Sequence, residues 1–217
     1  MAQQFHKNFM EKVVTSLFYI DIDDLSDITI CCRTIPQILK QWDEALGIEE
    51  RVYENLARVF YSNMKLSVTG KDRVVTHVGG VRIEFDIFEL SSILGISNEG
   101  LYLYTSRKEL YFSQFTHFEK VRNICRRHDI FNEVCSLSFR SQLLPFQVYI
   151  LHSIIRHMIT PRQGHNDEVT RLDISLIDSL IRGRKVHLAF TIMCHMLSIL
   201  AVSNRSLPYG SIISKIL

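Results

Sequence analysis

The spacing of hydrophobic residues along the chain predicts a mainly helical protein. In most segments apolar residues recur three or four positions apart, which places them on one face of an amphipathic helix. Proline and glycine mark several helix ends; Pro36, for example, suits the first turn of a helix that Gly47 stops. Helices are therefore expected over about residues 5–19, 36–46, 50–64, 87–95, 114–128, 145–159, 173–183 and 186–201, with a short one from Tyr209.

The hydrophobic pattern changes between residues 65 and 86, where short runs rich in β-branched residues replace the helical spacing. The runs KLSVT, RVVTHV and VRIEFD are separated by Gly70-Lys71-Asp72 and by Gly79-Gly80. Glycine supplies the positive φ angles that tight hairpin turns require. Three strands cannot bury both of their own faces, so helices must cover the sheet. The predicted fold class is mainly α (α+β), a multi-helix domain with a small antiparallel three-stranded β-meander near residues 65–86.

The helix that follows the meander has clear start and stop signals. Asp86 is suited to cap it, with Glu89 three residues on in capping-box register, and Gly95 ends it. No internal repeat or low-complexity linker interrupts the chain. We therefore expect one domain over residues 1–217, with its weakest seam near residues 129–141.

Two blocks of the sequence resemble the family catalogued as putative plant transposon protein. The first, Val75–Ser97 (VTHVGGVRIEFDIFELSSILGIS), is similar to that family's hairpin followed by a helix that closes in a Leu-Gly turn. The second, Leu143–Leu217, has the family's Leu-Pro pair, aliphatic helix, polar loop, Asp-Ile-like helix and long apolar helix. The resemblance covers about residues 35–217. It implies an origin in a plant mobile element, and it supplies no catalytic residues.

The end of the sequence departs from a complete member of that family. Residues 211–217 (SIISKIL) are apolar and carry no polar tail. Aliphatic side chains left in water are unfavourable, by ~25 cal/mol per Å² of apolar surface. We therefore expect a C-terminally incomplete domain with an exposed aliphatic end.

Composition places the chain among globular proteins, with 47% hydrophobic and 22% charged residues. The net charge is only +2, but it is unevenly distributed. Residues 1–96 carry 10 Lys/Arg and 14 Asp/Glu, whereas residues 97–217 carry 15 and 9. Such asymmetry can mark a half that faces nucleic acid, although two ordinary solvated surfaces would also produce it.

The spacing of the cysteines and the hydropathy of the chain indicate where in the cell the protein is located. The five cysteines include no CxxC pair, so zinc-finger spacing is missing, and no signal peptide precedes them. We expect an intracellular protein, nuclear or cytoplasmic and not secreted. The run Val186–Asn204 approaches the ~20 residues of a bilayer span, but His187 and His195 interrupt it. A buried helix with hydrogen-bonded core histidines is the preferred interpretation, with no membrane partner.

No sequence motif indicates catalysis. GxSxG, Cys–His and P-loop patterns are missing, so we expect no catalytic residues, no cofactor and no small-molecule substrate. One dense group of carboxylates, formed by Asp21, Asp23, Asp24 and Asp27, could bind a cation. Aspartate is also the usual resident of loops and helix starts, so no metal site is predicted there.

The predicted helix 145–159 carries a polar stripe. At 100° per residue, His152, Ser153, Arg156 and His157 fall within one arc, opposite an aliphatic arc. The stripe could contact phosphate or a partner, but a solvated helix face is the preferred interpretation.

Basic residues in the second half are the candidates for nucleic-acid binding. A helix near residues 114–128 holds one cluster, residues 182–185 hold another, and two arginines lie near the polar stripe. Aromatic residues upstream, Tyr102, Tyr104, Tyr111 and Phe112, could stack on bases, although a core role is preferred for them. The candidate nucleic-acid-binding residues are Lys120, Arg122, Arg126, Arg127, Arg156, Arg162, Arg182, Arg184 and Lys185.

These observations together favour a non-enzymatic protein derived from a plant mobile element. The expected role is that of a gag-like structural or interaction domain, with self-association, RNA or DNA as its candidate partners. Two alternatives stay open: a transposase or nuclease remnant with a metal-dependent phosphoryl-transfer ancestry, and a truncated product without function.

Overall fold

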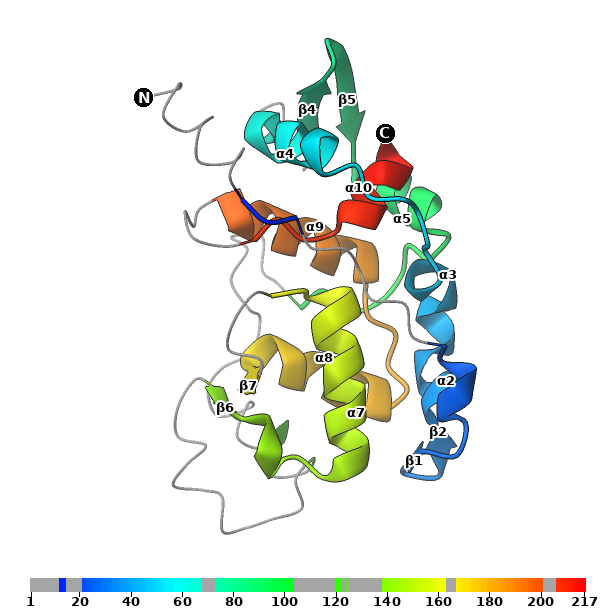
Figure 1. Ribbon diagram of the computed structural model, residues 1–217. Helices are drawn as coiled ribbons and strands as arrows, with labels where there is room; N and C mark the ends of the chain where they lie inside the picture. Colours follow the sequence, from blue (N-terminus) through cyan, green and yellow to red (C-terminus); the bar gives the residue numbers. More distant parts are fainter. Residues whose placement is uncertain are drawn as a thin grey trace.

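The computed structural model describes residues 12–14, 21–67, 73–103, 120–121, 124, 138–162, 167–200 and 206–217. The predicted helix 5–19 and most of the predicted helix 114–128 lie outside these residues, as does most of the predicted seam at 129–141. In Figure 1 the β-meander lies at one end of the molecule with α4, α5 and α10, and the pair α7 and α8 lies at the other end. Those basic candidates of the sequence that the structure describes belong mainly to this second end.

The predicted β-meander is confirmed. It consists of β3 (Lys65–Leu66), β4 (Val74–Val78) and β5 (Val81–Phe85), paired antiparallel in the order β3-β4-β5. Val78 pairs with Val81 across Gly79 and Gly80, whose φ angles of 59° and 82° are those of a tight hairpin turn. Helix α4 (Glu54–Asn63) covers one face, where Phe60 stacks on Phe85 and its carbonyl accepts a hydrogen bond from Thr76 Oγ1.

The helix after the meander begins and ends as the sequence predicts, whereas α4 begins at Glu54 rather than near residue 50. Asp86 caps α5 (Ile87–Leu94) in a capping box with Glu89, and Gly95 ends it in the left-handed conformation. The predicted helix 36–46 is present in three short pieces, α2 (Ile35–Leu39), a 3₁₀ turn at Lys40–Trp42 and α3 (Asp43–Leu46).

The last third contains the four helices that the sequence indicates. They are α7 (Phe146–Ile154), which continues as a π-helical turn over Ile155–Ile159, α8 (Arg171–Ile181), α9 (Leu188–Leu200) and α10 (Gly210–Ile216). Almost every residue of α9 is buried, and α9 packs against α5. None of the helices in the described part of the chain is both long enough and apolar enough to cross a bilayer.

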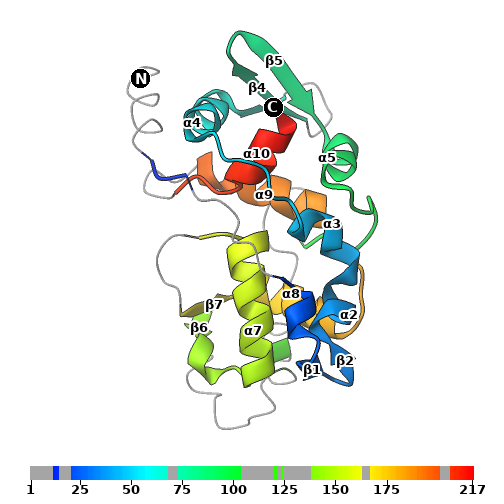
Figure 2. The same cartoon turned by 45° about the vertical axis from the view of Figure 1, so that its right-hand side comes forward.

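The expectation of an exposed aliphatic end is wrong for Ile212 and Ile213, although Leu217 is 43% exposed. Figure 2 shows α10 between α4 and α5, above α9. Ile212 and Ile213 are fully buried there, and Gly210 is so close to Val52 that a Cβ atom would lie 2.7 Å from it. The apolar character of Ile212 and Ile213 is therefore explained by their packing in the core.

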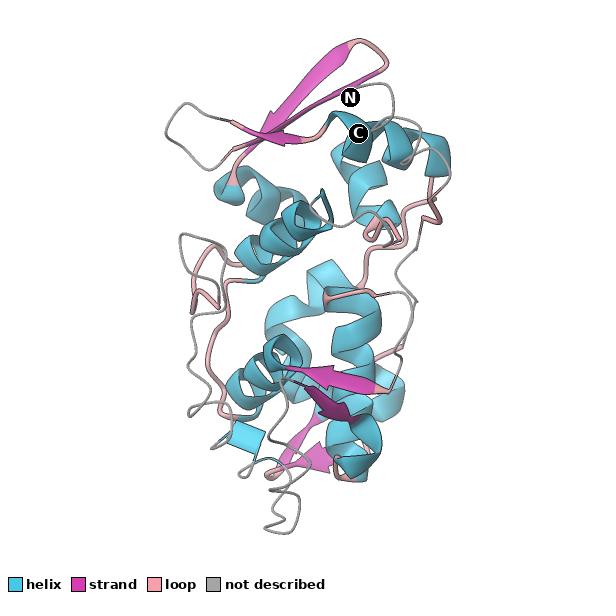
Figure 3. Cartoon of the chain, turned by 90° about the vertical axis from the view of Figure 1, so that its left-hand side faces the viewer, coloured by secondary structure: helices cyan, strands magenta, loops and turns pink. Residues whose placement is uncertain are grey.

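Two short strand pairs were not predicted (Figure 3). Thr29–Ile30 (β1) pairs with Arg33–Thr34 (β2), and Ser138–Arg140 (β6) pairs with Glu168–Thr170 (β7). Strands of two or three residues are too short to show an alternating pattern in the sequence. Together with the meander they make the fold α+β rather than all-helical, in agreement with the predicted class.

Candidate nucleic-acid interface

The carboxyl end of α8 holds a group of basic side chains around one carboxylate. Asp178 is buried on the last turns of the helix, and Arg182, four residues later, donates from Nε to its Oδ1 at 2.7 Å. Gly183, with a φ of 67°, reverses the chain and brings Arg184 Nη2 onto Oδ2 of the same carboxylate. One aspartate thus holds two arginines that follow it by four and six residues.

Two further cations reach the same helix end from elsewhere in the sequence. Lys120 is buried beside Asp178, Arg182 and Arg184; burial lowers its pKa to about 8, Asp178 opposes that change, and the two arginines add to it. Arg33, on β2, donates from Nη1 to the Leu180 carbonyl at 3.1 Å. We call Arg33, Lys120, Arg182 and Arg184 the basic cluster. Cations are favoured at this end of a helix because its carbonyl dipoles make it negative.

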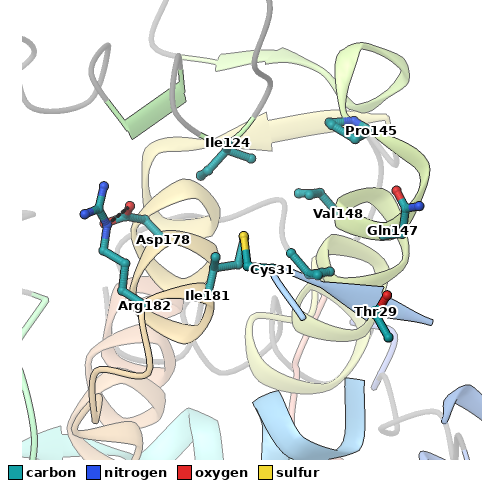
Figure 4. Close-up of a pocket in the computed structure, with 10 residues that line it drawn as sticks. Thr29, Cys31, Ile124, Pro145, Gln147, Val148, Asp178, Ile181 and Arg182 are labelled. Atoms are coloured by element: carbon teal, nitrogen blue, oxygen red, sulfur yellow. Dashed lines mark hydrogen bonds and ion pairs between the residues drawn. The ribbon is translucent and has the colours of Figure 1, made fainter. Parts of the chain in front are cut away.

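The basic cluster borders a cleft of about 480 Å³. Figure 4 shows the paired Asp178 and Arg182 on the α8 side and Gln147 and Val148 on the α7 side, with Cys31 of the β1–β2 turn between them. The cleft therefore combines apolar walls with a charged edge. Its lining residues are Thr29, Ile30, Cys31, Ile124, Pro145, Gln147, Val148, Asp178, Ile181 and Arg182.

Lys185 and Tyr102 belong to two distant segments that pair with each other. The Leu101 N–H donates to the Lys185 carbonyl at 2.9 Å, and the His187 N–H donates to the Leu101 carbonyl at 3.1 Å. Lys185 is exposed and forms an ion pair with Glu99 at 3.1 Å. Tyr102 is 53% exposed, with one side of its ring against His187. An exposed aromatic ring and an exposed cation thus belong to two segments that pair through their backbones.

Arg156 and Arg162 lie in a different, buried group centred on Asp173. Arg162 Nη2 donates to Asp173 Oδ2 at 2.6 Å, and the Thr170 N–H donates to the same oxygen at 2.7 Å. Burial acts to raise the pKa of Asp173, but His152, the charge of Arg162 and the Thr170 N–H outweigh it and lower the pKa to about 2. Arg156 is buried as well. This group joins α7 to the start of α8.

The preferred interpretation of the polar stripe on helix 145–159 is therefore wrong for two of its four residues. His152 is 1% exposed and Arg156 is 4% exposed, because both face the Asp173 group. A buried carboxylate compensates polar groups that would otherwise be costly to bury. The side chains that α7 exposes instead are Gln147 and the rings of Phe146 and Tyr149.

The structure thus divides the nine candidate residues. Lys120, Arg182 and Arg184 come together, with Lys185 near them, whereas Arg156 and Arg162 belong to the Asp173 group. Arg122, Arg126 and Arg127 lie outside the described residues, as do Tyr104, Tyr111 and Phe112. Arg33 was missed by the sequence analysis, because a lone arginine in a two-residue strand carries no signal of its own.

The two histidines of the predicted helix 186–201 have a structural role. His187 and His195 are buried and hydrogen-bonded in the core, as predicted; His195 Nδ1 lies 2.8 Å from the Tyr209 hydroxyl. Among the described residues, no three or more His, Cys, Asp or Glu side chains gather closely enough to share a metal ion.

Comparison with known proteins gives one match. A family model described as a putative plant retrotransposon-related domain matches residues 39–217. No curated protein and no solved structure matches the chain.

Proposed function

The chain belongs to the putative plant retrotransposon-related domain family and is transposon-derived, and from this premise we propose that it acts as a non-enzymatic, gag-like structural domain that associates with single-stranded nucleic acid. The proposed contact surface is the basic cluster at the end of α8 together with Lys185 and Tyr102.

The observation that carries this proposal is the excess of positive charge at the end of α8. Arg182 and Arg184 pair with the carboxylate of Asp178, the charge of Lys120 interacts with it, and Arg33 donates to the Leu180 carbonyl at the same helix end. The side chains of Arg182 and Arg184 remain 50% and 39% exposed while they contact it. A guanidinium has five N–H donors, so each arginine can bind the carboxylate and still offer donors to a phosphate. Phosphate contacts supply most of the affinity of sequence-independent nucleic-acid binding.

Tyr102 favours a single strand over a duplex. Unpaired bases stack on aromatic rings, which adds about 1–3 kcal/mol per base without any sequence requirement. Tyr102 exposes its ring on the segment that pairs with the Lys185 segment, so a base that stacks on the ring would bring its strand towards the ammonium group.

The test measures binding of a fluorescent single-stranded RNA by anisotropy between 50 and 200 mM salt, with Lys185→Ala compared against Lys65→Ala. Lys65 is also an exposed lysine, but it belongs to β3 at the other end of the molecule. Loss of one phosphate contact lowers the slope of log K against log salt by about 1. We expect that change for Lys185→Ala and none for Lys65→Ala.

A second pair of variants tests stacking. Tyr102→Leu should weaken RNA binding roughly tenfold, whereas Tyr53→Leu, at an equally exposed tyrosine before α4, should not change it. The proposal fails if the unaltered protein does not bind RNA at the lowest salt, or if both members of each pair behave alike.

A further inference from the structure

The outer edge of β5 has no strand beside it in the described part of the chain. The sheet order is β3-β4-β5, so β5 pairs with β4 on one side only. All of its residues, Val81–Phe85, stay in regular register with β4 without a bulge. The hairpin of β4 and β5 also projects beyond α4 (Figures 1 and 2). A regular, unpaired edge is a template on which another strand can pair.

Arg82 and Glu84 direct their backbone groups to this edge. The two-glycine turn closes on a hydrogen-bonded pair, and bonded and non-bonded pairs alternate from there along the hairpin. The N–H and C=O groups of Arg82 and Glu84 therefore point away from β4. The opposite strand agrees, because the carbonyl of His77, across from Arg82, accepts from Asn63 Nδ2 on the β3 side at 2.7 Å. We call the N–H and C=O groups of Arg82 and Glu84 the β5 edge groups; no hydrogen bond from another described residue reaches them.

The two side chains at these positions carry opposite charges. Arg82 is 61% exposed and Glu84 is 30% exposed, and Arg82 Nη2 lies 2.6 Å from Glu84 Oε2. Thr76, which pairs with Ile83, bonds to α4, so Ile83 belongs to the face that α4 covers and the two charged residues belong to the other face. Charges protect an edge from its own copy when like signs meet. Charges of alternating sign do not, because an antiparallel copy brings opposite signs together.

We propose that β5 is a self-association edge, through which two copies of this chain pair antiparallel about a twofold axis at Ile83. In this register Arg82 of each copy lies opposite Glu84 of the other, which forms two reciprocal ion pairs. The β5 edge groups of both copies then bond to one another, as in any antiparallel pair. The inference rests on the structural role proposed above and names the edge through which copies meet.

Charge selects this register over its neighbours. A shift of two residues in either direction keeps the hydrogen-bonding pattern, but it places Arg82 opposite Arg82 of the other copy, or Glu84 opposite Glu84. Like charges directly opposite each other are destabilising. The register centred on Ile83 also brings Val81, which is 63% exposed, opposite Phe85 of the other copy, where α5 begins.

The paired copies would share one six-stranded sheet, which is an ordinary size for a sheet. The contact is short, since five residues of strand span about 17 Å. We therefore expect a weak dimer in which main-chain hydrogen bonds supply the affinity and the two ion pairs supply the register. The opposite edge of the same sheet, β3, has only two residues and offers too few backbone groups to pair in this way.

Sedimentation velocity of the full chain, at concentrations up to about 1 mM, tests the proposal with Arg82→Glu compared against Lys65→Glu. Lys65 is exposed on β3, so both substitutions change the charge of the meander by the same amount, but at opposite edges. Arg82→Glu places two carboxylates opposite each other in both halves of the pair and should weaken dimerisation at least about tenfold. Lys65→Glu should leave it unchanged.

A charge exchange tests the register. The double variant Arg82→Glu with Glu84→Arg should recover the dimer that Arg82→Glu loses, because opposite charges again meet at both positions. Glu84 also pairs with Arg73 at 2.9 Å, so a thermal melt establishes that the double variant is folded. If it does not fold, amide exchange of the unaltered chain decides.

Amide hydrogen exchange, followed by NMR, identifies the edge itself. The N–H groups of Arg82 and Glu84 should exchange more slowly at about 1 mM than at about 10 μM chain, whereas those of Ile83 and Phe85, already bonded to β4, should not respond.

The proposal is overturned if the unaltered chain stays monomeric up to about 1 mM, if Lys65→Glu dissociates it equally, if the folded double variant stays monomeric, or if the two edge amides do not respond to concentration. RNA binding measured on monomeric Arg82→Glu separates the two proposals, since the basic cluster and Tyr102 are intact in it.

Discussion

Replacing Asp173 by Asn removes one buried charge while keeping the shape of the side chain. Asp173 has no exposed surface, and its carboxylate accepts hydrogen bonds from Arg162, from the Thr170 N–H and, at 2.8 Å, from the Thr170 hydroxyl. An Asn amide keeps one acceptor oxygen, but its NH₂ group must face donors. Removing one partner of a buried pair costs about 3–5 kcal/mol. We expect a loss of that size, which is a large part of a typical stability of about 5–15 kcal/mol.

Urea denaturation at pH 7, followed by circular dichroism, measures this loss. Asp86→Asn is the matched control, because Asp86 also belongs to a capping box but is partly exposed, and Asn is as good an N-cap as Asp. We expect the control to change the free energy of unfolding by less than about 1 kcal/mol.

The pH dependence gives an independent check. The pKa of Asp173 is lowered from 3.8 to about 2 in the folded protein, so its ionised form contributes about 2 kcal/mol of stability above pH 4. That contribution is lost as the pH falls from about 4 to 2, where the folded protein must also take up the proton. The difference between the unaltered chain and Asp173→Asn should shrink over this range. A difference below about 1 kcal/mol at pH 7, or one that does not change between pH 4 and 2, would refute the reasoning.

Two further substitutions test how the segments are joined. Gly100→Ala should destabilise the chain by about 2 kcal/mol or more in a thermal melt, because Gly100 has a φ of 132° and a Cβ would lie 2.6 Å from the Val186 backbone; an unchanged Tm would contradict this close approach. Tyr209→Phe should cost about 1–3 kcal/mol in urea, since it removes the hydroxyl that donates to the Ile159 carbonyl at 2.6 Å and contacts His195; a loss below about 0.5 kcal/mol would show that these bonds contribute little.

Local signals in the sequence predicted the elements whose chemistry is local. The Gly79-Gly80 turn and the β-branched runs beside it located the meander, and Asp86, Glu89 and Gly95 located both ends of α5. Capping side chains bond to backbone within three residues and a hairpin turn needs only its own glycines, so the sequence contains all that these features require.

The candidate interface could be predicted only in part. Residues 182–185 are recognisable in the sequence as a basic run. Their arrangement, however, depends on Asp178 and on Arg33, which lies 147 residues from its partner Leu180. Nothing in the neighbourhood of Arg33 in the sequence indicates that contact. The predicted Lys120 belongs to the same cluster, yet its burial and lowered pKa follow from the helix end against which it packs.

By itself, the sequence determined the helices, the meander, the capping residues and the family resemblance, because periodicity, turn chemistry and caps act over a few residues. Only the tertiary structure decided which face of α7 is buried. Amphipathic spacing predicted a solvated stripe at His152 and Arg156, yet Asp173 on α8 compensates these groups and draws them inside, while Phe146 and Tyr149 remain in water. A polar residue can be buried when a charged group from another segment pairs with it, and the fold decides where that charged group lies.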